Sequence, residues 1–169
     1  MDQNEKLANF GITHVITMYD YSGLITAHSV MPIKNNIKIY DAVFKPTVLE
    51  YGLWDQVVVD AGKAFCLVLA VQQAMEPFRT DRGIVPFKQI PSTKNNRIER
   101  LWVEVNSRVN YPLNRCLNSM FEQGMLDEND EVDKFVCSWT GIQIAEAGMQ
   151  IHVTSRNNHT IPSNVFLYS

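Results

Sequence analysis

Short apolar runs alternate with helical spacing along the first half of the chain. Residues 11–18 and 24–31 are rich in β-branched side chains and flank a turn, a pattern that predicts a β-hairpin. Apolar side chains then recur at helical intervals over residues 36–51, where Pro46 is expected to kink the helix. The residues ahead of the hairpin, taken without context, are expected to be a frayed terminus.

The rest of the chain predicts two further strands and a helical second half. A buried strand, a helix and a short strand are expected at residues 56–59, 63–75 and 85–90. From residue 96 onward the spacing is helical, with an expected interruption at Pro112 and a last helix opened by an acidic stretch at 127–133. Strands and helices in this order favour an α/β sheet with helices on its faces.

Composition and charge limit the class of protein. Of the 169 residues, 46% are hydrophobic and 20% are charged, which is typical of one globular domain with its own core. The formal net charge of −3 argues against a strongly basic nucleic-acid binder but allows a local basic patch. Cys66, Cys116 and Cys137 have no paired spacing and are expected to be buried free thiols.

Neither a secretory signal nor a membrane span is evident in the sequence. Charged residues follow Met1 closely, and no apolar run reaches the ~18 residues that a membrane helix needs. The expected location is therefore nuclear or cytoplasmic.

Two carboxylates stand out by their positions. Asp60 follows the buried strand, at the carboxyl edge where open α/β sheets place their sites, although spacing alone favours a helix cap near Lys63. Glu99 lies in the first turn of the long helix, where Asn96 and Glu99 fit a capping box. The same helix start is polar and basic, which would equally suit a phosphate: Lys94, Asn95, Arg97 and Arg100.

The order Asp2, Asp60, Glu99 resembles the Asp, Asp, Glu triad of integrase catalytic cores, which have a ribonuclease H-like fold. The resemblance is greatest to the transposable-element-related integrase-core proteins of animals. It rests on Met-Asp-Gln-Asn-Glu-Lys-Leu, Tyr-Asp-Tyr-Ser, Asn-Asn, Asp-Ala-Gly-Lys and Ser-Thr-Lys-Asn-Asn-Arg-Ile-Glu-Arg-Leu-Trp, which begin at residues 1, 19, 35, 60 and 92. It covers nearly the whole chain, and Asp60 lies 39 positions before Glu99, a spacing typical of the family.

Three departures from the family pattern bear on the site. Asp20 falls one place late in the hairpin motif, and Ala61 and Ala64 stand where the family often has polar residues. The first Asp lies inside a central strand in the family, whereas Asp2 here follows only Met1. The resemblance thus implies an integrase core-like domain over residues 1–156, truncated at its first strand, with an irregular tail at 157–169. A core truncated in this way is expected to be poorly stable and close to inactive.

The resemblance also implies metal-dependent phosphodiester chemistry. Asp2, Asp60 and Glu99 would be catalytic and would ligate Mg²⁺ or Mn²⁺, with two ions expected and Asp20 as the reserve first carboxylate. Divalent cations relieve the repulsion by which clustered carboxylates raise each other's pKa. The implied partner is DNA, and a homo-oligomer is compatible with the family. DNA phosphates would be contacted, with low sequence specificity, by Lys63, Lys94, Asn95, Arg97 and Arg100.

Two hypotheses for the function remain open. The first is a polynucleotidyl transferase core for DNA integration or transposition. The second is a non-catalytic, domesticated or truncated core that binds nucleic acid or protein. Both imply a ribonuclease H-like α/β fold: a mixed sheet, made of a hairpin plus parallel strands, flanked by helices and followed by an extra C-terminal helical segment.

Overall fold

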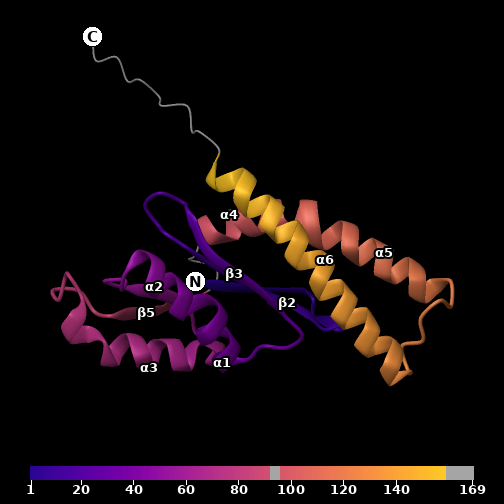
Figure 1. Cartoon of the computed structure of the whole chain (residues 1–169), viewed down its shortest axis with the longest axis horizontal. Helices are drawn as coiled ribbons and strands as arrows, with labels where there is room; N and C mark the ends of the chain where they lie inside the picture. The colour runs from indigo at the N-terminus through magenta and orange to yellow at the C-terminus, as the bar shows by residue number, and fades with distance from the viewer. Residues whose placement is uncertain (92–95, 159–169) are drawn as a thin grey trace, which may run out of the picture.

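The computed structural model describes residues 1–91 and 96–158 (Figure 1). The strands are β1 (Asp2–Leu7), β2 (Ile12–Met18), β3 (Ile25–Met31), β4 (Val57–Asp60) and β5 (Phe87–Ile90). The α-helices are α1 (Asn36–Ile39), α2 (Lys45–Tyr51), α3 (Cys66–Ala74), α4 (Asn96–Val105), α5 (Tyr111–Glu122) and α6 (Glu131–Asn157). Shorter helical turns are η1 (Ala8–Phe10), η2 (Tyr40–Phe44), η3 (Lys63–Phe65), η4 (Glu76–Phe78) and η6 (Asn106–Asn110).

The strands form an antiparallel sheet, β1-β2-β3, and a parallel pair, β4-β5. Asp2 lies opposite Ile16 in the β1–β2 ladder. The α-amino group of Met1 donates a hydrogen bond to the carbonyl of Val58, at 2.9 Å, and so joins β1 to β4. The predicted hairpin and the two later strands are confirmed, but the expectation that Asp2 precedes the first strand is wrong, because residues 2–7 form β1.

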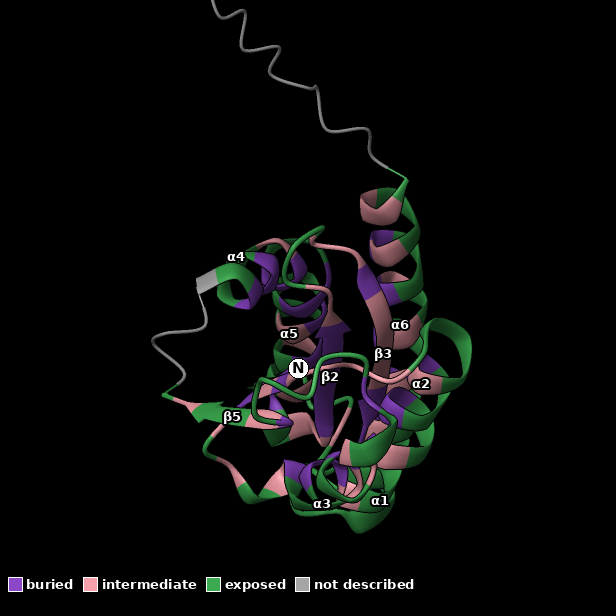
Figure 2. Ribbon diagram, turned by 90° about the vertical axis from the view of Figure 1, so that its left-hand side faces the viewer, coloured by how far each residue is buried: buried purple, intermediate pink, exposed green. Residues whose placement is uncertain are grey.

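Helices cover both faces of this strand layer. Helices α4, α5 and α6 share one core with β2 and β3, whereas η2, α3 and β4 share a second core on the other face. The two groups lie on opposite sides of the strands in Figure 1, and Figure 2 shows that β2 between them is largely buried. Successive residues of β2 supply the two cores: Val15 faces the second and Ile16 the first.

Two prolines that were expected to disturb helices are accommodated by wide turns. Pro46 and Pro112 each lie near the start of an α-helix and follow a π-helical turn, η2 or η6. In a π turn the backbone hydrogen bonds already depart from the α-helical pattern. The missing N–H of proline therefore disrupts the helix less at this place than it would inside a regular α-helix. The helical path consequently continues past Pro112 instead of ending there.

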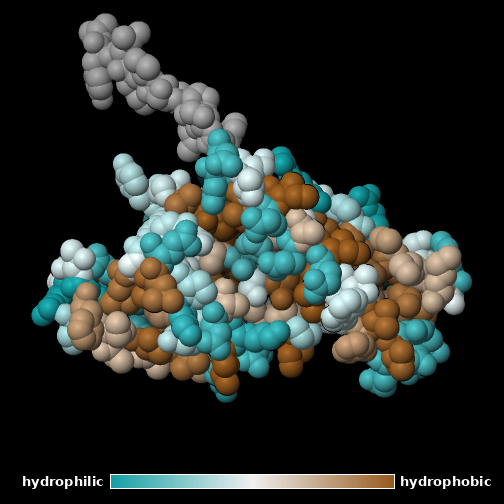
Figure 3. Space-filling model, viewed as in Figure 1, coloured by the Kyte–Doolittle hydropathy of each residue, from teal (hydrophilic) through white to brown (hydrophobic). Residues whose placement is uncertain are grey.

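Helix α6 is the longest element and starts as the sequence predicts. Asp130 caps it by accepting hydrogen bonds from the backbone N–H groups of Val132 and Asp133. Several apolar side chains of α6 are exposed: Val132, Phe135, Val136, Trp139, Ile144 and Ile151. Figure 3 shows hydrophobic and hydrophilic patches side by side on this face of the molecule. No helix in the described part of the chain is both long and apolar enough to cross a membrane.

The three cysteines are free, but their burial differs from the prediction. Cys137 is buried on α6, whereas Cys66 and Cys116 are exposed. Both exposed thiols lie on amphipathic helices, at positions that turn away from the core. Expecting all three to be buried was therefore wrong.

Candidate functional site

Asp2 is a buried carboxylate with two hydrogen-bond donors. The backbone N–H of Gln3 donates to one carboxylate oxygen at 2.9 Å, and the indole Nε1–H of Trp102 donates to the other at 3.1 Å. Burial raises the pKa of Asp2, and the negative charge of Asp60 adds to the rise, while the two donors oppose it. Trp102 thus links the first carboxylate directly to α4.

The bond between Met1 and Val58 brings the start of β1 next to β4, although the two strands belong to different sheets. Met1 and Val59 lie in the same core. Asp60 is near enough to Asp2 for its charge to raise the pKa of that carboxyl.

Asp60 does not cap the helix that follows it. Its Oδ1 accepts a hydrogen bond from the N–H of Gly62 at 3.2 Å, which closes a tight turn. Gly62 itself occupies the cap position of η3, and no side chain caps that turn. The prediction of a helix cap at Asp60 was wrong, and the carboxylate stays at the end of β4.

Glu99 lies in the first turn of α4 and is exposed. It is three residues before Trp102, so the two side chains share a face of the helix, one turn apart. Helix α4 begins at Asn96, which leaves the residue before it, and with it any cap, outside the described residues. The capping-box alternative for Glu99 is therefore untested.

A network of buried asparagines lies beside Asp2 and was not predicted. Asn106 Oδ1 accepts hydrogen bonds from the side-chain amides of Asn4, at 3.0 Å, and Asn110, at 2.8 Å. Asn4 Oδ1 in turn accepts the backbone N–H of Lys6 at 3.0 Å. The sequence signal for this network is weak: two asparagines four apart on an otherwise apolar helix face.

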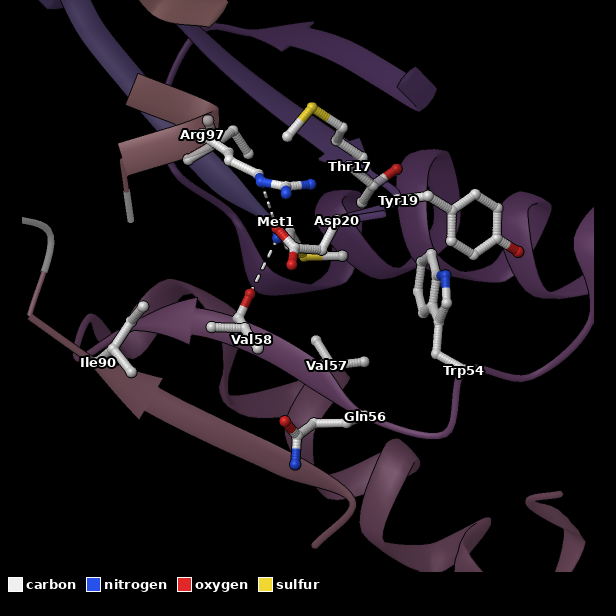
Figure 4. Close-up of a pocket in the computed structure, with 12 residues that line it drawn as sticks. Met1, Thr17, Tyr19, Asp20, Trp54, Gln56, Val57, Val58, Ile90 and Arg97 are labelled. Carbon is white, nitrogen blue, oxygen red and sulfur yellow. Dashed lines mark hydrogen bonds and ion pairs between the residues drawn. The ribbon is translucent and has the colours of Figure 1, made fainter. Parts of the chain in front are cut away.

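A pocket of about 590 Å³ opens between β2 and β4, beside the β1–β4 junction (Figure 4). Its lining includes Met1, Asp20, Val58 and Arg97. Arg97 Nε lies 3.7 Å from a carboxylate oxygen of Asp20, and both side chains are well exposed. The pocket therefore has a charged rim, and the Met1 amine in its lining is acted on by the charges of Asp2, Asp60 and Asp20.

Comparison with known proteins identifies the family. Residues 1–165 match the integrase core domain family. The chain belongs to this family. No curated protein and no solved structure gives a significant match. Membership agrees with the α/β architecture and with the ribonuclease H-like fold that the triad implied, and it places this integrase core in a family of polynucleotidyl transferases that bind nucleic acids.

The carboxylates of the integrase core fit a divalent metal by their chemistry. Oxygen ligands are those that Mg²⁺ and Mn²⁺ prefer, and a cation would stabilise a buried carboxylate whose pKa is raised. However, no group of three His, Cys, Asp or Glu side chains within residues 1–91 and 96–158 is arranged to hold a metal. The assignment of Asp2, Asp60 and Glu99 to one metal site stays a prediction.

The predicted phosphate contacts of the integrase core lie in more than one place. Arg97 and Arg100 are exposed on the first turns of α4, and Arg97 lines the pocket beside Asp20. Lys63 is exposed at the start of η3 and lines a different hollow together with Lys34. Lys94 and Asn95 lie outside the described residues.

Proposed function

We propose that this integrase core domain transfers phosphoryl groups of DNA strands, with Asp2, Asp60 and Glu99 as its catalytic, metal-ligating residues. The observation that carries this proposal is the Met1–Val58 hydrogen bond, because a parallel alignment of β1 with β4 through that bond would set Asp2 opposite Asp60. The bond from Trp102 to Asp2 supports it further, since it ties the helix that bears Glu99 to the first carboxylate.

Each residue has a separate task in the proposed reaction. Asp2 and Asp60 would hold the metal ions from the strand layer, and Glu99 would complete the ligand set from α4. A pair of Mg²⁺ or Mn²⁺ ions would supply charge stabilisation for the attacking and leaving oxygens at phosphorus. Arg97, Arg100 and Lys63 would contact DNA phosphates, which positions the strand without reading its sequence.

A DNA cleavage and strand-joining assay with Mn²⁺ tests the proposal. We expect weak metal-dependent activity in the unaltered chain and a further loss of about 100-fold or more in Asp60→Asn, the scale of removing one group that stabilises a transition state. Asp41→Asn is the matched control, because Asp41 is an exposed carboxylate on η2 that is not among the predicted site residues. Equal activity in Asp60→Asn and the unaltered chain would contradict the assignment.

A second candidate function is a non-catalytic core that binds nucleic acid or protein. Two observations favour it. Both carboxylate oxygens of Asp2 already accept hydrogen bonds from the protein. In addition, no three His, Cys, Asp or Glu side chains among the described residues are grouped closely enough to hold a metal ion. DNA binding that weakens with salt, together with no cleavage or joining at any metal concentration, would favour this function over the first.

Self-association of the chain also remains a proposal. Light scattering on the purified chain tests it: a mass of twice 19.3 kDa would support a homodimer, and a mass of 19.3 kDa would contradict it.

A further inference from the structure

A second cavity, of about 560 Å³, lies where the C-terminal end of α6 meets α4, η6 and the tip of the β2–β3 hairpin (Figure 1). Its polar lining comes from all of these elements: Ser22, Glu104, Arg108, His152, Ser155 and Arg156. The pocket between β2 and β4 has none of these residues in its lining. Glu104 lies five positions after Glu99, about 140° further around the helix, so the cavity opens on a different side of α4 from Glu99.

Hydrogen bonds hold the walls of this cavity in place. The Asn157 side chain donates to the carbonyl of Ile25 at 2.8 Å and accepts its N–H at 3.0 Å, which ties α6 to the start of β3. Arg156 Nη1 donates to both carboxylate oxygens of Glu104, at 3.0 and 2.9 Å, which ties α6 to α4. A ligand therefore meets a preformed site and needs to order little of the protein.

His152 is a buried residue of the cavity wall without a hydrogen-bond partner. Its side chain is only 3% exposed, and a carboxylate oxygen of Glu104 lies 4.0 Å from Nε2, which is too long for a hydrogen bond. Neither ring nitrogen has a partner among the described residues. Buried polar side chains are nearly always paired, so this ring points to a hydrogen-bonding group that enters the cavity.

The charges around His152 favour an anion as that group. Burial lowers the pKa of His152, Glu104 opposes the shift, and Arg108 and Arg156 add to it. The Nε of Arg156 is buried and has no partner within residues 1–91 and 96–158, while Arg108 is exposed. The two arginines would repel a metal cation, whereas an oxyanion would gain charged donors from both.

We propose that this cavity binds a terminal phosphate group, the phosphomonoester of a small molecule or of the end of a nucleic-acid strand. His152 donates one ring N–H to the phosphate from the buried side, and Arg108 and the Nε of Arg156 supply the charged donors. The hydroxyls of Ser22 and Ser155 belong to the same lining and can donate as well.

A phosphomonoester suits this site better than other anions do. Its three free oxygens point in three directions and can meet donors from the hairpin, η6 and α6 at once, whereas a carboxylate has only two oxygens in one plane. An internal phosphodiester carries a sugar on both sides, which would keep its phosphorus away from a ring as buried as that of His152.

Titration with inorganic phosphate, followed by NMR of the His152 ring, tests the proposal. Sodium chloride keeps the ionic strength constant, and sodium acetate is the planar comparison anion. We expect phosphate to shift the His152 signals in a saturable manner and to raise the pKa of His152, because a bound anion favours the imidazolium form. Acetate should shift the signals far less.

Arg108→Gln removes one proposed donor and should leave the fold intact, because Arg108 is exposed. Phosphate should bind to this variant more weakly by about 10-fold or more, the effect of losing one hydrogen bond to a charged group. Arg115→Gln is the matched control, because Arg115 is an exposed arginine on α5 that does not line the cavity. Its phosphate affinity should be unchanged, and equal weakening in the two variants would contradict a defined site.

Two short oligonucleotides, one with a 5′-phosphate and one with a 5′-hydroxyl, distinguish the two sources of the phosphate. Movement of the His152 signals by the phosphorylated strand alone would identify a strand end. Movement by inorganic phosphate but by neither strand would identify a small phosphate ester. His152 signals that phosphate leaves in place, or that acetate or both strands move equally, would overturn the proposal. Because the readout involves neither metal nor cleavage, failure here is distinguishable from failure of the proposed function.

Discussion

The two borders of β1 are built very differently. Toward α4 and η6, β1 is held by the Trp102–Asp2 bond and by the hydrogen bonds among Asn4, Asn106 and Asn110, all buried. Toward β4, the only hydrogen bond recorded among the described residues is the one from Met1 to Val58, with an open pocket beside it. The first border holds the carboxylate of Asp2, whereas the second carries the alignment that we propose for Asp2 and Asp60.

The border toward α4 and η6 has more buried hydrogen bonds and so contributes more to stability, whereas the border toward β4 matters more for the proposed site. Buried polar networks are costly to break, because each group left unpaired is far from water. The border with β4 holds fewer such groups, yet the proposed placement of Asp2 beside Asp60 depends on it. Substitutions on the helix side should therefore cost the most stability, whereas changes at the β4 side should cost less.

The largest expected effect is at Asn106, the centre of the helix-side border. Asn106→Leu leaves the amides of Asn4 and Asn110 without their shared acceptor, at about 1–3 kcal/mol for each buried unpaired group. Urea unfolding should show a loss of about 2–6 kcal/mol for the two groups together. In the control, Asn118→Leu, the altered amide is exposed, and its change should stay within about 0.5 kcal/mol. Equal losses in the two variants would show that the network does not stabilise the border.

The next effect is a pH dependence that originates at the β4 border. The Met1 amine has a pKa of about 6 in the folded chain against 8.0 as a free terminus, so the unfolded state binds more protons between these values. Stability should rise as pH increases from about 6 to about 8, by at most about 2–3 kcal/mol.

N-terminal acetylation is the control for this pH window. It removes the titrating amine, so the rise between pH 6 and 8 should disappear. The rise at lower pH should stay, because burial also lowers the pKa of His14, to about 4 against 6.5, and this group acts between those values. A rise between pH 6 and 8 that survives acetylation would assign the effect to another group.

A smaller effect is expected where α4 meets Asp2. Trp102→Phe keeps an aromatic ring but removes the donor to the carboxylate, so the pKa of Asp2 should rise further. The loss of stability should be about 1–2 kcal/mol, since a hydrogen bond to a charged group is removed. Carboxyl NMR titration reports the pKa, and Trp139→Phe, at an exposed tryptophan, is the matched control. An unmoved Asp2 pKa would contradict the role of the indole.

The sequence predicted the strands with regular patterns and missed the one without. Strands β2, β3 and β4 carry β-branched or apolar runs, which a periodic pattern detects, and β5 was predicted as part of a short segment between two prolines. Strand β1 reads Asp-Gln-Asn-Glu-Lys-Leu, and its buried side chains include Asp2 and Asn4, so hydropathy gives no strand signal. Only the resemblance to integrase cores indicated that Asp2 belongs to a strand.

The site was only partly accessible from the sequence for a similar reason. Spacing suggested that Asp60 caps a helix, but its side chain instead accepts the N–H of Gly62 in a tight turn. The contact between Met1 and Val58 joins residues far apart in the sequence, so no local pattern could predict it. Asn4 and Asn106 meet across about a hundred residues of sequence, a pairing that requires the assembled fold. Local signals describe elements, whereas the site depends on contacts between elements.

The most direct test of the central claim is whether one metal ion reaches all three carboxylates. Substoichiometric Mn²⁺ should broaden the carboxyl ¹³C signals of Asp2, Asp60 and Glu99 together, before those of exposed acids such as Asp41. Simultaneous broadening of the three signals, abolished by Asp60→Asn, is the predicted result. Broadening that begins in the acidic turn at Asp127, or that reaches Asp60 without Asp2 and Glu99, would contradict a shared site.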